Sequence, residues 1–224
     1  MYINVVADNC MFVGQWDRIA DDVCAEVDRY PAANVGDAME RFGLMNSMIA
    51  ARTDRAHVTG TALTILTREG DNLAIHRALD DAQRGDVLVI NGGGDTGRAV
   101  FGDLLAEVCL ARGIAGVVID GAVRDVAAIS ALGLPVWARA VTPAGPTKTG
   151  PGRIGLPIAC GGVVVESGDL IVGDTDGVAV VPASQVLDVL SRLEQIERVE
   201  ADFRTRVHLD RDAVAAGRRE EVPA

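Results

Sequence analysis

The sequence has almost no lysine, no closely spaced cysteines and no apolar run long enough to cross a membrane. Lys148 is the only lysine among 21 Lys and Arg residues, so a reaction through a lysine Schiff base must use Lys148 or cannot occur. A membrane helix needs about 18 consecutive apolar residues, and no segment comes near that length. Residues 1–18 lack the basic and apolar regions of a secretion signal, which favours a cytoplasmic location.

Metal-binding and disulfide patterns are also missing. The cysteines and histidines are Cys10, Cys24, Cys109, Cys160, His57, His76 and His208. No two cysteines form a CxxC pair, and the histidines have no spacing typical of metal ligands. We therefore interpret the cysteines as small buried residues in a reducing compartment.

Acidic residues exceed basic ones, with 32 Asp and Glu giving a formal net charge of −11. An acidic chain without a Lys/Arg-rich run repels phosphate backbones, so we expect neither a nucleic-acid partner nor a membrane partner. The 224 residues, 49% of them hydrophobic, are enough for one domain with a substantial core. We treat residues 1–224 as that single domain.

The middle of the chain alternates between short apolar runs and helical patterns. Strands are expected over 57–66, 86–91, 115–120 and 135–139, with helices starting at Asp71, which caps the first, and covering about 103–112 and 123–132. Short connections between them are typical of a parallel βαβαβ sheet. The predicted fold class is therefore α/β.

The two ends of the chain have a different character. Helices are expected over 17–30, closed by Pro31, and over 34–41, which together make an N-terminal helical part of about 1–45. After a loop rich in Pro, Gly and Thr, apolar runs at 161–167, 168–174 and 177–182 predict a β-meander. A C-terminal helix over 183–207 and a frayed tail complete the part from about 183 to 224.

A glycine-rich loop offers one functional alternative. Gly92-x-Gly94-x-x-Gly97 follows a strand, and Asp120 ends the next strand, as in a dinucleotide-binding fingerprint. However, the next helix begins near Asp103 rather than at the glycines. Arg124 and Asp125 would also place two charges where a ribose would sit. These two points count against a nucleotide-dependent oxidoreductase, which we keep as an alternative function.

Two other segments carry the stronger chemical signal. Gly102 to Glu107 opens a helix, whose free backbone N–H groups can bind a small carboxylate. Arg124 and Asp125 follow the next strand, and successive parallel strands bring both segments to one sheet edge. Because Mg²⁺ keeps several waters, one carboxylate and a chelating 2-oxo acid can complete its shell. Asp103 could instead be only a helix cap, and the Arg–Asp pair only a surface ion pair.

The segments GDVLVINGGG, FGDLLAEVCLARGIAGVVIDGAVRD, LPVWARAVTPAG and SGDLIVGDTDGVAVVP resemble the RraA-like family. The resemblance covers about residues 35–200, and its most specific element is D-x20-R-D, met here by Asp103, Arg124 and Asp125. It implies a swivelling β/β/α domain that assembles as a homotrimer or a hexamer of paired trimers, with active sites between subunits. The family includes metal-dependent aldolases and non-catalytic regulators of ribonuclease activity.

The resemblance also implies roles for individual residues. The backbone amides of Gly102, Asp103, Leu104 and Leu105 would hold the carboxylate of a 2-oxo acid, and Arg124 would contact its 2-oxo oxygen. Asp125 would bind the metal, and Asp103 would orient a water on that metal. Glu200 matches a catalytic glutamate delivered from a neighbouring subunit, although Glu197 lies one turn away. Lys148 and His76 match further family positions and support the site.

The function implied is a class II aldolase that uses Mg²⁺, Mn²⁺ or Co²⁺, without a nucleotide or pyridoxal phosphate. Its substrates would be 4-hydroxy-2-oxo acids such as 4-hydroxy-4-methyl-2-oxoglutarate and 4-carboxy-4-hydroxy-2-oxoadipate, cleaved to pyruvate and a second oxo acid. Oxaloacetate decarboxylation is expected as a side activity. The regulators resemble the same frame but lack the Asp after the Arg, so Asp125 favours the aldolase, and a protein-binding regulator is the alternative.

Overall fold

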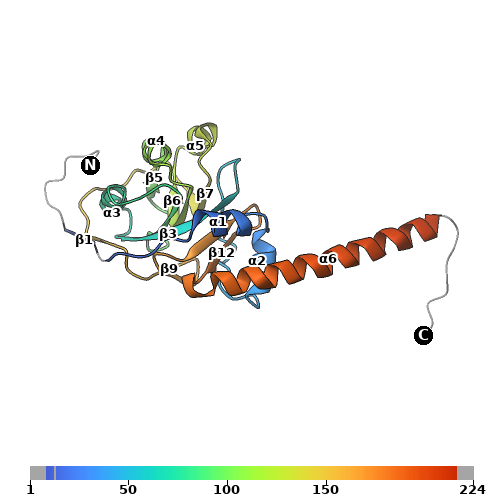
Figure 1. Ribbon diagram of the computed structural model, residues 1–224. Helices are drawn as coiled ribbons and strands as arrows, with labels where there is room; N and C mark the ends of the chain where they lie inside the picture. The colour runs from blue at the N-terminus through green and yellow to red at the C-terminus, as the bar shows by residue number, and fades with distance from the viewer. Residues whose placement is uncertain (1–8, 13, 216–224) are drawn as a thin grey trace.

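Four parallel strands form the centre of the fold, as the predicted βαβαβ pattern requires (Figure 1). The computed structural model describes residues 9–12 and 14–215. The central strands are β3 (Val58–Thr67), β4 (Asp86–Asn91), β6 (Gly116–Val123) and β7 (Val136–Val141). They pair in that order, each parallel to the next. The predicted α/β class is therefore confirmed.

Three helices cover one face of this sheet (Figure 1). They are α3 (Leu73–Ala78), α4 (Asp103–Arg112) and α5 (Val126–Leu132). Alternate residues of β4 explain why this strand reads as one apolar run. Leu88 and Ile90 pack under the helices, whereas Val87 and Val89 pack on the opposite side, so both faces are buried.

A second group of strands and helices covers the other face. Its strands are β9 (Ile158–Cys160), β10 (Val163–Val165), β11 (Leu170–Gly173) and β12 (Val178–Val181). Strand β8 (Gly152–Ile154) instead extends the central sheet, pairing antiparallel with β3. Strand β11 pairs antiparallel with both β3 and β12. Its inward residue Ile171 joins the inner core, whereas Leu170 and Val172 pack against the outer helices. Two β layers thus lie between two sets of helices.

Short strands extend the edges of this arrangement. They are β1 (Cys10–Phe12), β2 (Ala50–Ala51) and β5 (Ala99–Phe101). Strand β5 was not predicted, and it pairs parallel with the end of β6. It therefore brings the start of α4 beside the residues that follow β6. No helix in the described part of the chain has the length and apolarity needed to span a membrane.

The predicted N-terminal helices have the wrong bounds. The first, α1, covers only Asp21–Val27, and the second, α2, covers Ala32–Ala38. Pro31 precedes α2 as its N-cap instead of closing the earlier helix. Since proline cannot donate a hydrogen bond but suits a helix start, this position costs the chain little.

The predicted β-meander is also wrong in one pairing. Strand β10 forms a hairpin with β9, and only β11 and β12 are adjacent partners. Gly161 and Gly162 make the hairpin turn, both with positive φ, which glycine adopts at no steric cost. The sequence shows the apolar runs, but it does not show which of them pair.

The C-terminal helix is longer than predicted. After a 3-10 turn, η1 (Ala183–Gln185), α6 covers Val186–Ala215 and extends well beyond the rest of the domain (Figure 1). The expected fraying from residue 208 is therefore wrong as far as residue 215, and residues 216–224 lie outside the described part. Pairs such as Glu200–Arg204, with 2.6 Å between charged atoms, support the helix on its exposed surface.

The interpretation of the cysteines is confirmed for two of the four. Cys109 and Cys160 are fully buried in the core, and burial raises the pKa of each thiol to about 12. Cys10 and Cys24 are only partly buried, and none of the four forms a disulfide. The two core thiols are therefore protonated at neutral pH and chemically inert.

Candidate functional site

A cavity of about 430 Å³ opens at the carboxyl edge of the parallel strands. It gathers the five predicted substrate-binding residues, Gly102, Asp103, Leu104, Leu105 and Arg124. Further lining residues come from α3 and from the segment after β7; they include Asn72, His76 and Lys148. The expectation that the segments around 102–107 and 124 share one sheet edge is therefore confirmed.

The start of α4 differs slightly from the prediction. Asp103 is the first helical residue, and Gly102 is the N-cap, so Asp103 is not the cap. Ala106 donates the first intrahelical bond, to the carbonyl of Gly102, at 3.1 Å. The N–H groups of residues 103–105 precede that bond, so helix geometry gives them no intrahelical acceptor. The Asp103 carboxylate accepts the Leu104 N–H at 2.8 Å, a contact that an incoming anion would displace.

Gly102 is the point where the two predicted segments meet. A Cβ atom there would lie 2.7 Å from Oδ2 of Asp125 and 3.1 Å from Nε of Arg124. Its backbone is extended, so space rather than conformation requires glycine. The backbone N–H of Arg124 donates to the carbonyl of Phe101 at 3.0 Å, which fixes the two segments together.

Arg124 and Asp125 are held in a defined arrangement. Nε of Arg124 lies 3.1 Å from Oδ2 of Asp125, and both side chains are about one-third exposed, at 37% and 36%. A Cβ on Gly145 would lie 2.8 Å from Nη1 of Arg124, so the guanidinium runs between two glycines. Both groups keep contact with solvent and are accessible to a small ligand.

Asp125 has a backbone conformation that L-residues rarely adopt. Its φ of +58° and ψ of +33° are left-handed, and it is the N-cap of α5 without a side-chain capping bond. The predicted start of this helix at 123 is corrected to 126, because β6 continues through Val123. Backbone strain of this kind costs about 1–3 kcal/mol and is concentrated at functional sites. Here it leaves the carboxylate free of a capping role.

His76 and Lys148 both line the cavity, the first as a neutral side chain and the second as a cation. Burial, together with the positive charge of Lys148, lowers the pKa of His76 to about 4. The imidazole is therefore neutral at physiological pH, whereas a lysine ammonium is a cation. The cavity lining thus contains cations from two segments, Arg124 and Lys148, together with the acidic residues Asp103 and Glu107 at the start of α4.

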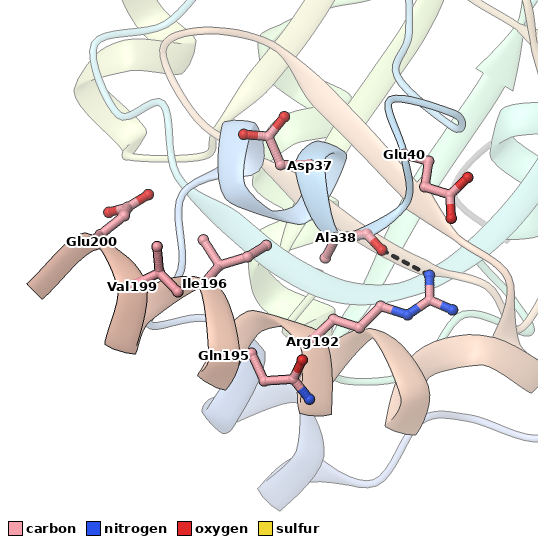
Figure 2. A pocket seen from close by; sticks show the side chains of 8 residues that line it. All are labelled: Asp37, Ala38, Glu40, Arg192, Gln195, Ile196, Val199 and Glu200. Atoms are coloured by element: carbon pink, nitrogen blue, oxygen red, sulfur yellow. Dashed lines mark hydrogen bonds between the residues drawn. The ribbon is translucent and has the colours of Figure 1, made fainter. Parts of the chain in front are cut away.

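The structure places Glu200 away from this cavity within one chain. It lines a second cleft, between α2 and α6, that also contains Asp37 and Arg192 (Figure 2). Its Oε1 accepts a hydrogen bond from Nδ2 of Asn34 at 3.1 Å. Glu197 instead accepts a bond from the hydroxyl of Tyr30 at 3.2 Å and does not line the cleft. Of the two glutamates, Glu200 is the one exposed to a cleft.

The glycine-rich loop does not have the geometry of a dinucleotide site. Residues 92–98 lead into β5 rather than into a helix. Asp120 lies within β6 instead of ending it, and its carboxylate pairs with Arg139 at 2.6 Å and accepts the Gly161 N–H at 2.9 Å. This acid holds the fold together and does not face a ribose site.

A family model described as RraA-like (Aldolase/RraA) matches residues 32–180 of the chain. The chain belongs to the RraA-like family. A Halalkalibacterium halodurans relative with the provisional name 4-hydroxy-4-methyl-2-oxoglutarate aldolase is 40% identical over 195 residues. That alignment covers 87% of this chain and 91% of the relative.

Other relatives have descriptions of two kinds. An Ectopseudomonas mendocina protein with the same provisional name is 35% identical over 164 residues, which cover 73% of this chain and 94% of that protein. A Streptomyces coelicolor crystal structure, described as an unusual member of the RNase ES inhibitor RraA protein family, superposes with a TM-score of 0.76 at 30% identity. It covers 85% of this chain and 99% of its own.

Two residues of the site were not recognised from the sequence. Asn72 lines the cavity while only 5% exposed, and its Oδ1 has no hydrogen-bond partner among the described residues. Its spacing of four residues from His76 puts both on one helix face, which is a signal that could have been used. Gly145 beside Arg124 has no local signal, because the contact depends on the tertiary fold.

The donor set of this RraA-like site fits a hydrated divalent cation rather than a protein cage. Within residues 9–12 and 14–215, no three His, Cys, Asp or Glu side chains gather as a metal centre. Asp125 does not line the cavity itself, but its partly exposed carboxylate lies 3.1 Å from Arg124, which does, and a carboxylate is a ligand that Mg²⁺ prefers. Mg²⁺ typically takes one or two such groups and fills its other positions with water and substrate oxygens.

Proposed function

We propose that this chain is a pyruvate-releasing aldolase for 4-hydroxy-2-oxo acids of the 4-hydroxy-4-methyl-2-oxoglutarate and 4-carboxy-4-hydroxy-2-oxoadipate type. One observation carries the proposal: the N-terminus of α4, Arg124 and Asp125 meet at Gly102, beside a cavity of substrate size. The provisional names of the bacterial relatives support the same reaction class.

The start of α4 binds the carboxylate next to the 2-oxo group. The backbone N–H groups of residues 103–105 have no intrahelical acceptor, and the positive end of the helix dipole favours an anion there; with the N–H of Gly102 they would hold the carboxylate. Arg124 contacts the 2-oxo oxygen, where negative charge develops when the C3–C4 bond breaks. A preorganised donor at such a position typically contributes about 3–4 kcal/mol to transition-state stabilisation.

Asp125 is the protein ligand for the divalent cation, Mg²⁺ or else Mn²⁺ or Co²⁺. The bound cation supplies a Lewis acid beside the 2-oxo group. Asp125 is suited to this task because its carboxylate is partly exposed and does not cap α5. Its contact with Arg124, at 3.1 Å, keeps the carboxylate beside the guanidinium that lines the cavity.

Cleavage begins with loss of the C4 hydroxyl proton. The C3–C4 electron pair then moves into the pyruvate enolate, C4 becomes the carbonyl of the second oxo acid, and C3 is finally protonated. Asp103, together with Glu200, would hold the water that takes up and returns this proton. Oxaloacetate reaches the same enolate by losing CO₂, so we propose decarboxylation as a side activity.

Glu200 reaches the site from a neighbouring copy of the chain. Within one chain it lies in the α2–α6 cleft (Figure 2), which shares no lining residue with the cavity that contains Arg124. A homotrimer, or two trimers paired as a hexamer, would bring that cleft to the cavity of the next copy. Asp37 and Glu200 would then enter together, because they line the same cleft.

A non-catalytic regulator that binds a ribonuclease is the second candidate. It is supported by the Streptomyces coelicolor neighbour and its description as a member of an RNase inhibitor family. Asp125 favours the aldolase, because a protein-binding role gives no reason to hold a carboxylate beside Arg124 in a strained conformation.

A pyruvate-release assay coupled to lactate dehydrogenase tests the proposal directly. The panel contains 4-hydroxy-4-methyl-2-oxoglutarate, 4-carboxy-4-hydroxy-2-oxoadipate and oxaloacetate, each with and without Mg²⁺ or Mn²⁺. We expect cation-dependent pyruvate release that Arg124→Ala lowers by about 10²–10³-fold, the usual effect of losing one such donor. Absence of release from the whole panel, combined with capture of a ribonuclease, would establish the regulator instead.

A further inference from the structure

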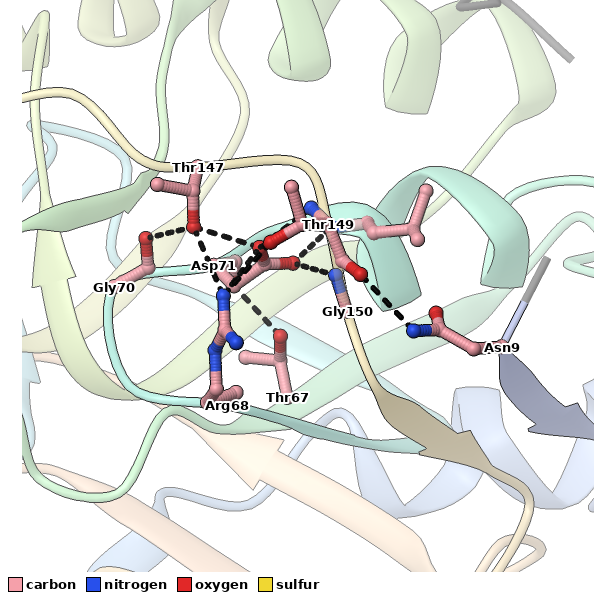
Figure 3. Close-up of polar contacts among 9 residues, drawn as sticks. Asn9, Thr67, Arg68, Gly70, Asp71, Thr147, Thr149 and Gly150 are labelled. Carbon is pink, nitrogen blue, oxygen red and sulfur yellow. Dashed lines mark hydrogen bonds and ion pairs between the residues drawn. The ribbon is translucent and has the colours of Figure 1, made fainter. Parts of the chain in front are cut away.

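Asp71 is a fully buried carboxylate whose two oxygens are surrounded by hydrogen-bond donors (Figure 3). Its Oδ2 accepts bonds from Oγ1 of Thr147 and from the backbone N–H of Thr149, both at 2.7 Å. Its Oδ1 accepts the N–H of Gly150 at 3.1 Å and that of Leu73 at 2.9 Å. Burial raises the pKa of Asp71, but these hydrogen bonds outweigh it and hold the pKa below 3.8.

This carboxylate joins two segments that are more than 70 residues apart in the sequence. One is the start of α3, and the other is the segment from Thr147 to Gly150 (Figure 3). Backbone bonds reinforce the junction: Asn72 N–H donates to the carbonyl of Thr147 at 3.0 Å, and Thr147 N–H donates to the carbonyl of Gly70 at 2.8 Å. Asp71 lies one residue before the N-cap of α3; its carboxylate accepts the N–H of Leu73 at the helix start, so the predicted bond is present, and the longer-range bonds add to it.

Each clamped segment carries side chains that line the cavity. Lys148 lies between Thr147 and Thr149, the two residues that bind the carboxylate. Asn72 directly follows Asp71, and His76 is one helical turn further along α3. The position of Lys148 relative to Asn72 and His76 therefore depends on Asp71.

We propose that Asp71 is a positioning residue that sets Lys148 against Asn72 and His76 and so shapes the cavity for the distal half of the substrate. This inference rests on the proposed function, in which the α4 end of the cavity holds the pyruvoyl half. Lys148 then faces the second carboxylate of a dicarboxylic substrate. The buried Oδ1 of Asn72, which has no hydrogen-bond partner among the described residues, also lines this part of the cavity.

The Asp71 network depends on a carboxylate and not only on a side chain of that size. A carboxylate without hydrogen bonds is costly to bury, and besides the four bonds above Asp71 accepts one from Oγ1 of Thr149 at 3.2 Å and pairs with Nη2 of Arg68 at 3.5 Å, which together offset its desolvation. Asparagine in its place keeps the size but presents an NH₂ group to donors that need an acceptor. Asp71→Asn should therefore release the Lys148 segment while leaving the core around it filled.

The kinetic experiment compares two reactions of the Mg²⁺-loaded protein. Solvent exchange of the pyruvate methyl protons uses only the pyruvoyl half, whereas aldol cleavage uses the whole substrate. We expect Asp71→Asn to raise KM for the dicarboxylate 4-hydroxy-4-methyl-2-oxoglutarate by about tenfold or more, the loss of one charge-assisted contact, and to leave the KM for pyruvate exchange unchanged. An equal loss in both reactions, or in neither, overturns the proposal.

Asp86→Asn is the matched control for loss of a buried carboxylate. Asp86 is also fully buried and pairs with Arg18 at 2.8 Å, but it does not line the cavity. It should lower Tm as Asp71→Asn does without changing the ratio of the two KM values. Thr147→Val removes a single donor to Asp71 and tests the same split if Asp71→Asn does not fold.

An NMR titration of His76 without substrate separates this proposal from the proposed function. In Asp71→Asn, movement of the 147–150 segment would take the positive charge of Lys148 away from His76 and expose His76 to water. Both effects should raise the pKa of His76 from about 4 toward 6.5. Loss of the Asp71 negative charge alone would lower that pKa, so a rise reports movement of the segment. An unchanged or lowered pKa of His76 would overturn the positioning role of Asp71, even if the protein proves to be an aldolase. If the pKa of His76 rises but the protein releases no pyruvate, the positioning role of Asp71 is supported and only the proposed function is contradicted.

Discussion

Nε of Arg124 lies 3.1 Å from Oδ2 of Asp125, and both atoms lie within about 3 Å of the position that a Cβ atom on Gly102 would take. Adjacent residues rarely form such a pair in a regular helix or strand, where their side chains diverge. It forms here because Asp125 is left-handed and turns the chain between β6 and α5. A cation and a carboxylate are thereby presented together at the N-terminus of α4.

Substitution of Asp125 separates chemistry from backbone strain. Asn tolerates the left-handed region, so Asp125→Asn should keep the wild-type Tm while losing cation-dependent pyruvate release. Asp125→Ala should lose the same activity and also about 1 kcal/mol of stability, because a Cβ-bearing residue without a polar side chain is strained there. Thermal unfolding and the coupled assay measure the two effects. Activity retained by Asp125→Asn would exclude Asp125 as the metal ligand.

Gly102→Ala should damage the site without unfolding the protein. The new Cβ would lie 2.7 Å from Oδ2 of Asp125, so the Arg124–Asp125 pair must shift. We expect kcat to fall by at least tenfold with a change in Tm of only a few degrees. Gly97→Ala is the control, because its nearest neighbour is the side-chain oxygen of Asp95 at 3.2 Å. Equal activity of the two variants would argue against close packing at Gly102.

The low pKa of His76 predicts a pH dependence of stability. The folded protein binds a proton at His76 only below about pH 4, whereas the unfolded chain does so below 6.5. The unfolded state therefore holds more protons between these values, and the free energy of unfolding falls as the pH is lowered from 6.5 to 4. His76→Gln should flatten this part of the curve in urea titrations. His208→Gln, an exposed change on α6, should leave the curve as it is.

Chelation and borohydride distinguish the two classes of aldolase. EDTA should stop pyruvate release, and added Mg²⁺ should restore it. Borohydride added with substrate should leave the protein mass unchanged, because no Schiff base forms. Mass spectrometry of the peptide that contains Lys148, the chain's one lysine, reads the result. A reduced adduct on Lys148 would contradict the proposed metal-dependent reaction.

The central fold was readable because local pattern and burial agree there. Strand β4 is a short apolar run between polar loops, and its spacing from β6 leaves room for one helix. The same spacing brought the segments at Gly102 and Arg124 to one edge, so most of the cavity was predicted. The bounds of β6 were not, since its extension to Val123 depends on pairing with β5.

What the sequence did not reveal depends on contacts between distant segments. Asp71 resembles a helix cap in the sequence because it directly precedes a helical pattern. Its carboxylate does accept the backbone N–H of Leu73, the first residue of α3. Its bonds to Thr147 and Thr149 join residues 76 and 78 positions away, which no local pattern reports. The C-terminal helix was predicted too short because α6 beyond residue 207 has no core face to give it an apolar period.

The length of α6 has a consequence for how its backbone exchanges hydrogen with water. A helix of 30 residues is about 45 Å long, and its first turns pack on α2, whereas Val199, Phe203 and Val207 are exposed. Amide protons of a helical segment without tertiary contacts exchange rapidly, because each turn opens alone. The deuterium profile along this single helix therefore falls into a slow part and a fast part in an isolated chain. Any copy that covers the far part would convert it to slow exchange, residue by residue.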